Sequence, residues 1–307
     1  MEIALMRSPL TFVWNPSKVR HMEHSIRTRY LSWALLALLS SLWCTSAVAE
    51  EWYRPFVVAK TKGKTVAEAV ENATTQLKAG GLEVVGQYAP YDDDSAVIIG
   101  FTSPELKQAA ASQEFGGFGG VLRVAVTDNA GAIEVSYVNP EYIGYAYHLG
   151  DLSAITAQVE GALGKRKSFG AKGLREDMLE RYHYMMFMPY FKDKRVIARF
   201  ADHASAVQKV AAALQHPDSD MSAVWQVQVS DDQTVFGVKL HGGKWEGQME
   251  KIMSKIDVDS PKSTAALPWE LLVTGEKLVY LPGKFRIAVM FPDLPMGTFM
   301  QISNVPD

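Results

Sequence analysis

The chain has 307 residues, of which 31 are basic and 34 are acidic, and it contains a single cysteine. This length is sufficient for one large core or two ordinary ones, and the nearly balanced charge excludes the strongly basic surface with which proteins bind nucleic acid. Because the one cysteine is Cys44, the residues after it offer no disulfide, no thiol chemistry and no cysteine zinc site.

The N-terminal segment has the pattern of a secretory signal peptide. Arg27 and Arg29 precede an apolar run over residues 31–43, and Ala47 and Ala49 provide the small residues at which signal peptidase cleaves. The run has 13 residues, whereas a membrane-spanning helix needs about 20. We therefore expect a signal peptide over residues 1–49 and a periplasmic or secreted protein with no stable membrane span.

Three alternatives at this end of the chain stay open. The apolar run could be a retained anchor, and Cys44 could carry a lipid, although the bulky Trp43 precedes it where a lipoprotein has a small residue. Met22 would place both arginines nearer the N-terminus and is an alternative start. The residues after position 49 include 26 basic and 32 acidic side chains, and this mildly acidic balance favours solubility.

The pattern of the first half alternates between strands and helices. Thr65 and Glu68 have the spacing of a capping box at a helix start, and Asp128 to Gly131 has the composition of a hairpin turn. The expected elements are a strand over 52–59, a helix over 65–81, strands over 82–88 and 96–101, a helix over 103–113, strands over 121–127 and 133–138, and helices over 140–146 and 152–163.

The second half repeats this order loosely. The expected elements are a strand over 196–200, a helix over 204–214, strands over 223–229 and 234–240, a helix over 245–256, and strands over 269–274, 284–290 and 297–302. The repeated order indicates a tandem duplication, with two unrelated lobes as the alternative.

Hairpin-paired strands with helices between them predict an α+β fold. We expect two lobes, each a mainly antiparallel sheet with helices packed on one face as a two-layer sandwich. The boundaries are 50–163 for the first lobe, 164–192 for a linker that contains an amphipathic helix over 174–184, and 193–307 for the second lobe.

Residues 56–148 resemble the DUF302 family in three pieces. The pieces are the helix over 65–81 with the following residues 82–85, the segment Ile99-Gly100-Phe101-Thr102-Ser103-Pro104, and the segment Val135-Ser136-Tyr137-Val138-Asn139-Pro140-Glu141-Tyr142, with His148 shortly after. Gly100 and Phe101 stand in the inverse of the family's order, and Ala89-Pro90-Tyr91 replaces its Asp-His pair. The resemblance implies a small α+β domain, often dimeric and of unknown function. It also implies that a duplicated chain could form such a dimer within itself.

A cluster of aromatic side chains lies at the end of the strand expected over 133–138 and in the residues after it. Its members are Tyr137, Tyr142, Tyr145, Tyr147 and His148. Such side chains combine an apolar body with a polar end, so they could bind an organic ligand or donate hydrogen bonds to an anion. The alternative is a packed seam between a helix and a sheet.

One histidine and three methionines lie together over residues 183–188. His183 with Met185 and Met188, which share a face at helical spacing, could bind copper(I) or haem iron through imidazole and thioether groups. Met186 would turn away from that face. The alternative is an apolar seam between the lobes, because methionine also fills cores.

Motifs of catalysis are missing from the sequence. It contains no Gly-x-Ser-x-Gly, His-Glu-x-x-His or Cys-x-x-Cys-His segment, and the glycine-rich residues 116–120 lack the Lys-Ser/Thr of a phosphate loop. We therefore expect an exported, non-catalytic ligand-binding or accessory protein with an unknown small-molecule or protein partner and no assigned cofactor. A periplasmic copper or haem protein, an enzyme without a recognisable motif, and a structural interaction module with a large exposed apolar patch are the alternatives.

Overall fold

The computed structural model describes residues 51–91, 93–241 and 252–302. The expected signal peptide lies outside the described residues, as does most of the helix expected over 245–256, of which residues 252–256 are helical. The described part from Glu51 onward forms one compact unit. Among these residues no helix combines the length and the apolar character needed to cross a membrane.

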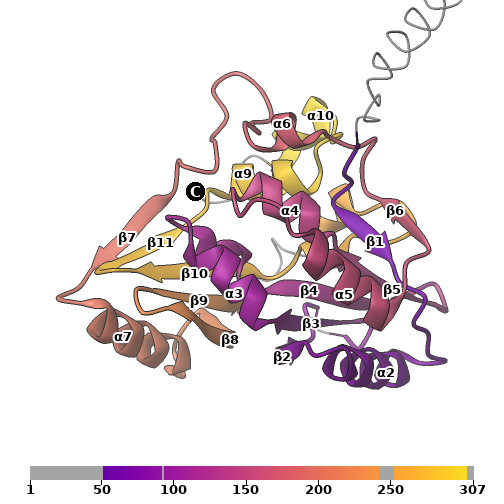
Figure 1. The fold of residues 1–307 in the computed structure, drawn as a ribbon, viewed down its shortest axis with the longest axis horizontal. Helices are drawn as coiled ribbons and strands as arrows, with labels where there is room; N and C mark the ends of the chain where they lie inside the picture. Colours follow the sequence, from indigo (N-terminus) through magenta and orange to yellow (C-terminus); the bar gives the residue numbers. More distant parts are fainter. Residues whose placement is uncertain (1–50, 92, 242–251, 303–307) are drawn as a thin grey trace, which may run out of the picture. The chain divides into compact units, whose positions relative to one another are not determined.

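The first sheet has six antiparallel strands in the order β2-β3-β4-β5-β1-β6 (Figure 1). Its strands are β1 (Phe56–Val58), β2 (Glu83–Tyr88), β3 (Ala96–Thr102), β4 (Leu122–Asn129), β5 (Ala132–Val138) and β6 (Lys167–Phe169). The helices of this half are α2 (Val66–Ala79), α3 (Pro104–Ala111), the 3-10 helix η1 (Gly116–Gly119), α4 (Pro140–Ala146), α5 (Ser153–Leu163) and α6 (Glu176–Leu179).

The second sheet has five antiparallel strands in the order β7-β11-β10-β9-β8. Its strands are β7 (Arg195–Arg199), β8 (Met221–Ser230), β9 (Gln233–Leu240), β10 (Trp269–Thr274) and β11 (Lys277–Tyr280). The other elements of this half are α7 (His203–Gln215), the 3-10 helix η2 (Thr264–Ala266), α9 (Gly283–Met290) and α10 (Met296–Ile302). The α+β fold with two mainly antiparallel sheets is therefore confirmed.

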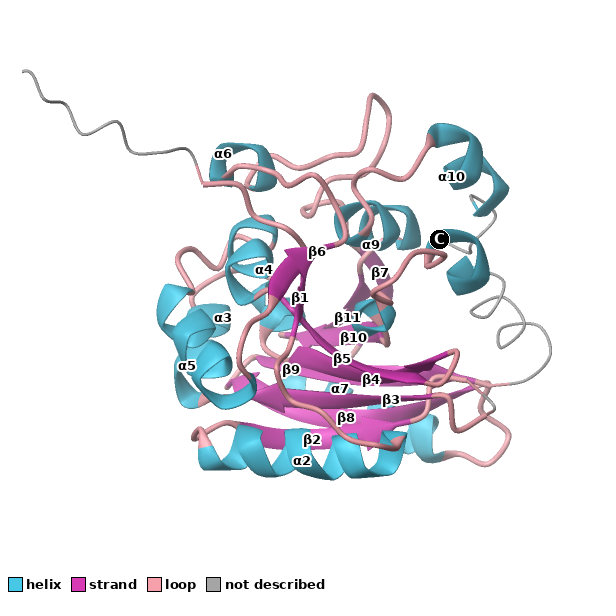
Figure 2. Cartoon of the chain, turned by 90° about the vertical axis from the view of Figure 1, so that its right-hand side faces the viewer, coloured by secondary structure: helices cyan, strands magenta, loops and turns pink. Residues whose placement is uncertain are grey.

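The two sheets have the same connectivity. Starting from an edge, the first runs β2-β3-β4-β5-β1 and the second runs β8-β9-β10-β11-β7, so the first strand of each half pairs with its fifth. Helix α2 follows the first strand of one half and α7 follows the first strand of the other, and each packs against its own sheet (Figure 2). The sheet of the first half has β6 as an additional edge strand.

Local signals in the sequence account for several helix starts. The Thr65 hydroxyl accepts a hydrogen bond from the Glu68 amide at 3.1 Å, and the Ser103 hydroxyl accepts one from the Leu106 amide at 3.1 Å. In each case a short polar side chain satisfies an amide that has no partner in the first helical turn. The helices expected from residues 65 and 103 are thereby confirmed.

Two expected strands are helices in the structure. Residues 284–290 belong to α9 and residues 297–302 belong to α10, while the strand β11 falls at 277–280. Every residue of α9 except Lys284 is buried. A helix surrounded by protein on all sides lacks the one-sided apolar stripe of a surface helix, so its apolar run resembles that of a buried strand.

The segment expected as a linker helix is mostly irregular. Instead of a helix over 174–184, the structure has only the four residues of α6, preceded by β6, which pairs with β1 and extends the first sheet. Phe187, which lies between Met185 and Met188, adopts a φ angle of 70°, a region that a helix does not use. The face that Met185 and Met188 would share on a helix is therefore not formed.

The main hydrophobic core contains residues from both sheets, and a smaller core lies under α7. Where the sheets meet, the indole of Trp225 on β8 lies against glycines. A Cβ atom on Gly100 would come within 2.7 Å of this ring, and one on Gly237 within 2.2 Å. Glycine at both positions therefore leaves the space that the indole fills, with the ring of Tyr88 6.2 Å away at its edge.

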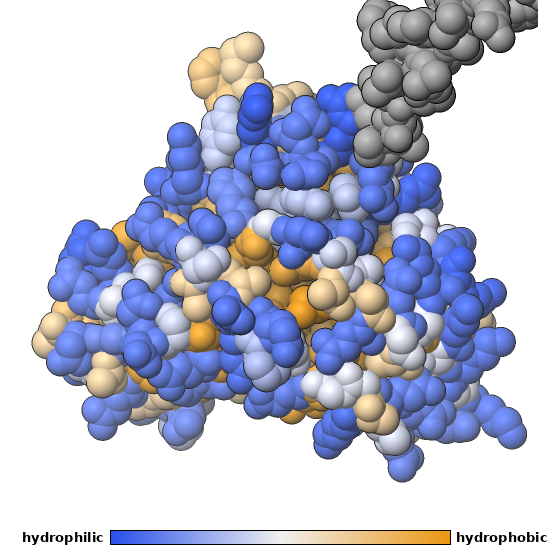
Figure 3. Space-filling view, in the orientation of Figure 1, coloured by the Kyte–Doolittle hydropathy of each residue, from blue (hydrophilic) through white to orange (hydrophobic). Residues whose placement is uncertain are grey.

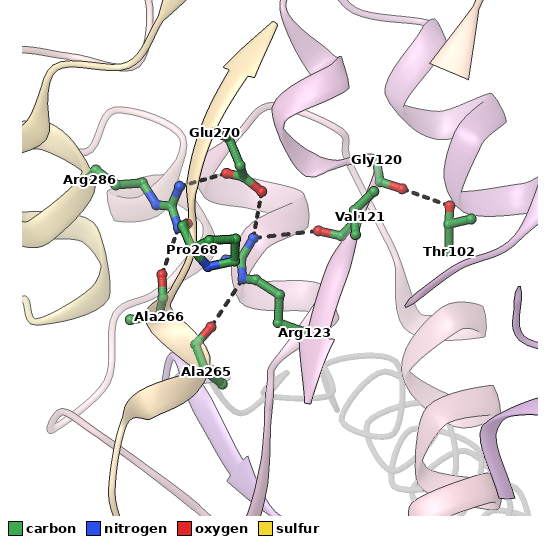
Figure 4. A network of polar contacts seen from close by, with 9 residues as sticks. All are labelled: Thr102, Gly120, Val121, Arg123, Ala265, Ala266, Pro268, Glu270 and Arg286. Atoms are coloured by element: carbon green, nitrogen blue, oxygen red, sulfur yellow. Dashed lines mark hydrogen bonds and ion pairs between the residues drawn. The ribbon is translucent and has the colours of Figure 1, made fainter. Parts of the chain in front are cut away.

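A buried network of charges joins the two halves (Figure 4). The Glu270 carboxylate on β10 accepts hydrogen bonds from Arg123 Nη1 on β4 at 2.8 Å and from Arg286 Nη1 on α9 at 2.6 Å. The carbonyl oxygens of Ala265 and Ala266 accept from Arg123 Nε and Arg286 Nη2. All three charged side chains are almost fully buried. Burying charge is costly unless each group is paired and hydrogen-bonded, so these contacts require both halves to be assembled.

We expect Glu270→Gln to lower the free energy of unfolding by about 3–5 kcal/mol, because it leaves two buried guanidinium groups without a carboxylate. Urea unfolding measures the change. The control is Glu276→Gln, which removes a pair with Arg199 in which both side chains are more than half exposed and should cost less than about 1 kcal/mol. Equal small losses for the two variants would contradict a stabilising role of the buried network.

Candidate functional site

The structure places the tyrosines of the expected ligand cluster in the interior. Tyr137, Tyr142 and Tyr147 are fully buried, and Tyr145 is nearly so, with its ring 5.1 Å from that of Tyr53. Burial raises the pKa of Tyr137, Tyr142 and Tyr147, so these hydroxyls stay protonated. The four tyrosines are brought together as packing around α4.

The side chains of this cluster contact other parts of the chain, although the buried hydroxyls of Tyr137 and Tyr147 have no hydrogen-bond partner among the described residues. The Tyr142 hydroxyl donates to the carbonyl oxygen of Val289 on α9 at 2.6 Å, and the Tyr147 ring stacks on Phe191 at 5.0 Å. His148 is exposed, and its Nε2 lies 2.8 Å from the carbonyl oxygen of Glu180. Ligand binding at this cluster stays a prediction, and its geometry is that of a seam between the two halves.

The residues of the expected metal site lie on the irregular segment after α6. The His183 ring stacks on Tyr190 with 4.5 Å between ring centres. Met185 is 42% exposed, whereas Met188 packs against the main core. Within the described ranges, no group of three or more His, Cys, Asp or Glu side chains could hold a metal ion. Copper or haem binding through His183 and the methionines stays a prediction.

An open hollow of about 590 Å³ lies beside the edge strand β6. Its lining combines the end of β1, the turn after it, part of β5, the start of β6 and the loop before η2. The lining residues are Val58, Ala59, Thr61, Lys62, Gly63, Ile133, Glu134, Val135, Arg166, Lys167, Ser260 and Pro261. This volume lies in the range of small-molecule sites, roughly 300–1,000 Å³.

A second hollow of about 680 Å³ continues from the first, because Lys167, Ser260 and Pro261 line both. We call the two together the β6 groove. The second hollow adds apolar residues, among them Phe169, Phe291 and Leu294, and the acidic residues Asp257, Asp259 and Asp293. The β6 groove is thus basic at one end and mixed apolar and acidic at the other.

The cations of the first hollow have no ion-pair partner among the residues that the structure describes. Lys62, Arg166 and Lys167 are exposed and form no salt bridge, whereas the neighbouring Lys165 pairs with Glu160 at 2.8 Å. The one carboxylate in the lining, Glu134, accepts hydrogen bonds from the Ser260 hydroxyl at 2.7 Å and the Lys262 amide at 2.8 Å. The three cations are therefore available to an anionic ligand.

Glu134 holds the wall of the groove that comes from the second half. Burial alone raises the pKa of its carboxyl, but hydrogen bonds from Lys262, Ser260 and Asn129 outweigh it and hold the pKa below its usual value. The Ser136 hydroxyl adds a bond to the carbonyl oxygen of Lys262 at 3.3 Å. The first sheet thereby fixes the position of the loop over 260–263.

Among the titratable groups that line the groove, Asp257 has the pKa that burial changes most. It is buried, and burial raises the pKa of its carboxyl to about 6 despite a hydrogen bond of 2.7 Å that it accepts from the Ser263 amide. A perturbed carboxyl in a cleft is a candidate for a functional role. Asp257 also has a structural role, because its hydrogen bond from the Ser263 amide holds the loop over 260–263.

Sequence reasoning missed the β6 groove. The signal present was the basic run over residues 165–167, which by itself is typical of a solvated linker. This run lines a hollow only together with residues 62, 134 and 260. The pairing of β1 with β5 and β6 brings these parts of the chain together. Compared with known proteins, the chain matches no family model, no curated protein and no solved structure.

The raised pKa of Asp257 predicts a pH dependence of stability. A carboxyl that ionises near 3.8 when unfolded and near 6 when folded stabilises the fold below pH 3.8, and this contribution is lost as the pH rises through 6. The full loss is about 3 kcal/mol. The stability of the wild type relative to Asp257→Asn should therefore fall between pH 4 and pH 7, by urea unfolding.

The control for this experiment is Asp259→Asn, which changes an exposed carboxyl in the same hollow. Its stability should follow the wild type across the same pH range. A constant difference between the wild type and Asp257→Asn over that range would contradict the burial of an ionisable group at Asp257.

Proposed function

We propose that the chain is an exported, non-catalytic binding protein that holds a small organic anion in the β6 groove. The observation that carries this proposal is the set of three cations, Lys62, Arg166 and Lys167, that line one hollow and have no ion-pair partner among the described residues. They stand out because the residues after position 49 have an excess of acidic over basic side chains.

The chemistry of the lining indicates the kind of ligand. A guanidinium binds carboxylate or phosphate oxygens through two parallel hydrogen bonds, and an ammonium adds a point charge. The far end offers Phe169 and Phe291 as apolar contacts and the carboxyl group of Asp259, which would repel a second anionic group. The ligand that fits has its acid group at Arg166 and Lys167 and its uncharged body toward Phe291.

We also propose export through the segment 1–49, supported by the charged, apolar and small-residue pattern described above. N-terminal sequencing of the protein isolated from the periplasm or the medium should begin at Glu50. Retention of earlier residues would contradict cleavage after Ala49 and favour the anchored or lipidated alternatives.

The proposal further includes a tandem repeat of DUF302-like halves that form a pseudo-dimer within one chain. The shared strand order supports it, and so does the register. Gly100 on β3 pairs with Arg123 on β4, and Gly237 on β9 pairs with Glu270 on β10. Arg123 and Glu270 thus occupy equivalent positions. An experimental structure in which β7–β11 do not superpose on β1–β5 in this order would contradict the repeat.

Binding in the groove is tested by thermal stability and calorimetry with a panel of organic carboxylates, sulfonates and phosphate esters. We expect a member of the panel to stabilise the protein, because binding to the folded state raises its melting temperature. The double variant Arg166→Gln/Lys167→Gln should weaken that binding by about tenfold or more, since each lost charge-assisted contact is worth more than about 1.4 kcal/mol.

The matched control is Lys165→Gln, which removes the adjacent cation that pairs with Glu160 outside the hollow. It should bind the same ligand with unchanged affinity. No stabilisation by any member of the panel, or binding that the double variant leaves intact, would contradict an anion site in the β6 groove.

A further inference from the structure

The segment between α6 and β7 presents large apolar side chains to solvent. We call residues 180–194 the methionine loop. Met186 is 74% exposed and Phe187 is 96% exposed, with Met185 and Tyr190 beside them also exposed. Exposed apolar side chains that lie together, rather than singly, mark sites of interaction.

The backbone of the methionine loop holds these side chains outward. The Met188 amide donates to the carbonyl oxygen of Met185 at 3.0 Å, which closes a turn with Met186 and Phe187 at its tip. Phe187 adopts a φ angle of 70°, a region that bulky side chains rarely occupy because it is strained. The surrounding contacts therefore maintain a conformation that an isolated chain would avoid.

Both sides of the tip are fixed to the body of the protein. The Tyr184 ring stacks on Phe299 of α10 at 5.0 Å, and its hydroxyl donates to the carbonyl oxygen of Leu294. On the other side, the Phe191 ring stacks on Tyr147. The tip thus projects from a fixed base, and Figure 3 shows apolar side chains protruding at the place that this loop has in Figure 1.

Basic residues flank the projecting tip in the sequence. Residues 165–199 contain ten basic and four acidic side chains, although acidic residues predominate in the chain after position 49. Arg181 precedes the tip, and Lys192, Lys194 and Arg195 follow it. A cluster of basic residues next to exposed apolar side chains is complementary to an anionic lipid surface, where the cations meet phosphates and the apolar groups enter the interface.

The chain enters the described fold at the same end of the molecule. The Tyr53 amide donates to the carbonyl oxygen of Leu174, and the Leu174 amide donates to that of Tyr53, both at 2.8 Å. Residue 51 therefore lies close to α6, which leads into the methionine loop (Figure 1).

We propose that the methionine loop contacts an anionic membrane surface, with Met186 and Phe187 entering the interface and the flanking cations on lipid phosphates. A protein partner fits less well, because a stable protein interface buries about 800 Å² on each side and a projecting turn of a few residues does not supply such an area. The contact is independent of ligand binding in the β6 groove.

The test is sedimentation of the protein over residues 50–307 with vesicles of phosphatidylcholine, with and without phosphatidylglycerol. We expect binding to the anionic vesicles only, and weaker binding as salt is raised. Met186→Ser/Phe187→Ser should reduce binding by about tenfold or more while the melting temperature is unchanged, because the two side chains are exposed. Arg181→Gln/Lys192→Gln should also reduce binding.

The control is Val258→Ser, which removes an apolar side chain that is 65% exposed on a different loop and should leave vesicle binding unchanged. Three results would overturn the proposal. These are no sedimentation with anionic vesicles, equal binding by the tip variant and the wild type, or a change of oligomeric state on substitution of Phe187 without any effect on lipid binding.

Discussion

The structure depends on the burial of two guanidinium groups around one carboxylate. Arg123 belongs to the first sheet, whereas Glu270 and Arg286 belong to the second half, together with the carbonyl groups of Ala265, Ala266 and Pro268 that accept further hydrogen bonds from the two guanidinium groups. Without the second half, the Arg123 guanidinium would lose its carboxylate partner, whereas Glu270 and Arg286 would keep each other. The two sheets therefore form a single compact unit, and the same assembly brings the loop over 260–263 onto Glu134 as the wall of the β6 groove.

The central contact joins two residues, Arg123 and Glu270, that occupy equivalent positions in the two sheets. In a symmetric dimer, the residue on the twofold axis meets its own copy. Two arginines or two glutamates would repel each other there, whereas Arg123 and Glu270 attract. Trp225 and Gly86 also occupy equivalent positions. Trp225 pairs with Gly237 in the second sheet, and Gly86 pairs with Gly100 in the first. A repeat within one chain is free to place different residues at equivalent positions, and this freedom favours the proposed duplication over an assembly of identical chains.

Local patterns predicted the local structure well and the long-range structure poorly. The caps at Thr65 and Ser103 and the hairpin around Asp128 depend on neighbours a few residues away, so the sequence alone was sufficient. Helix α9 was expected as a strand because its burial on all sides removes the helical period. The network between Arg123 and Glu270 joins residues 147 positions apart, and no local pattern indicates such a pair.

The difference between local patterns and long-range structure also explains which candidate sites could be predicted from the sequence. The composition of residues 137–148 indicated the tyrosine cluster, but composition does not distinguish the lining of a ligand site from a packed seam between elements. The methionines were expected on a helix, and the structure instead presents Met186 and Phe187 on a turn. The β6 groove needs β1, β5, β6 and the loop before η2 together, so only the arrangement of the sheets makes it visible.

The most direct test of this account is a double-mutant cycle between Arg123→Met and Glu270→Gln, with urea unfolding of both single variants and of the double variant. The account predicts one unfolding transition and a coupling energy above about 2 kcal/mol. Glu270→Gln alone leaves the Arg123 guanidinium buried without a carboxylate, and this cost is absent when residue 123 is already methionine. Losses that add to within about 0.5 kcal/mol, or separate transitions for the two halves, would contradict the claim that this buried contact holds the sheets together.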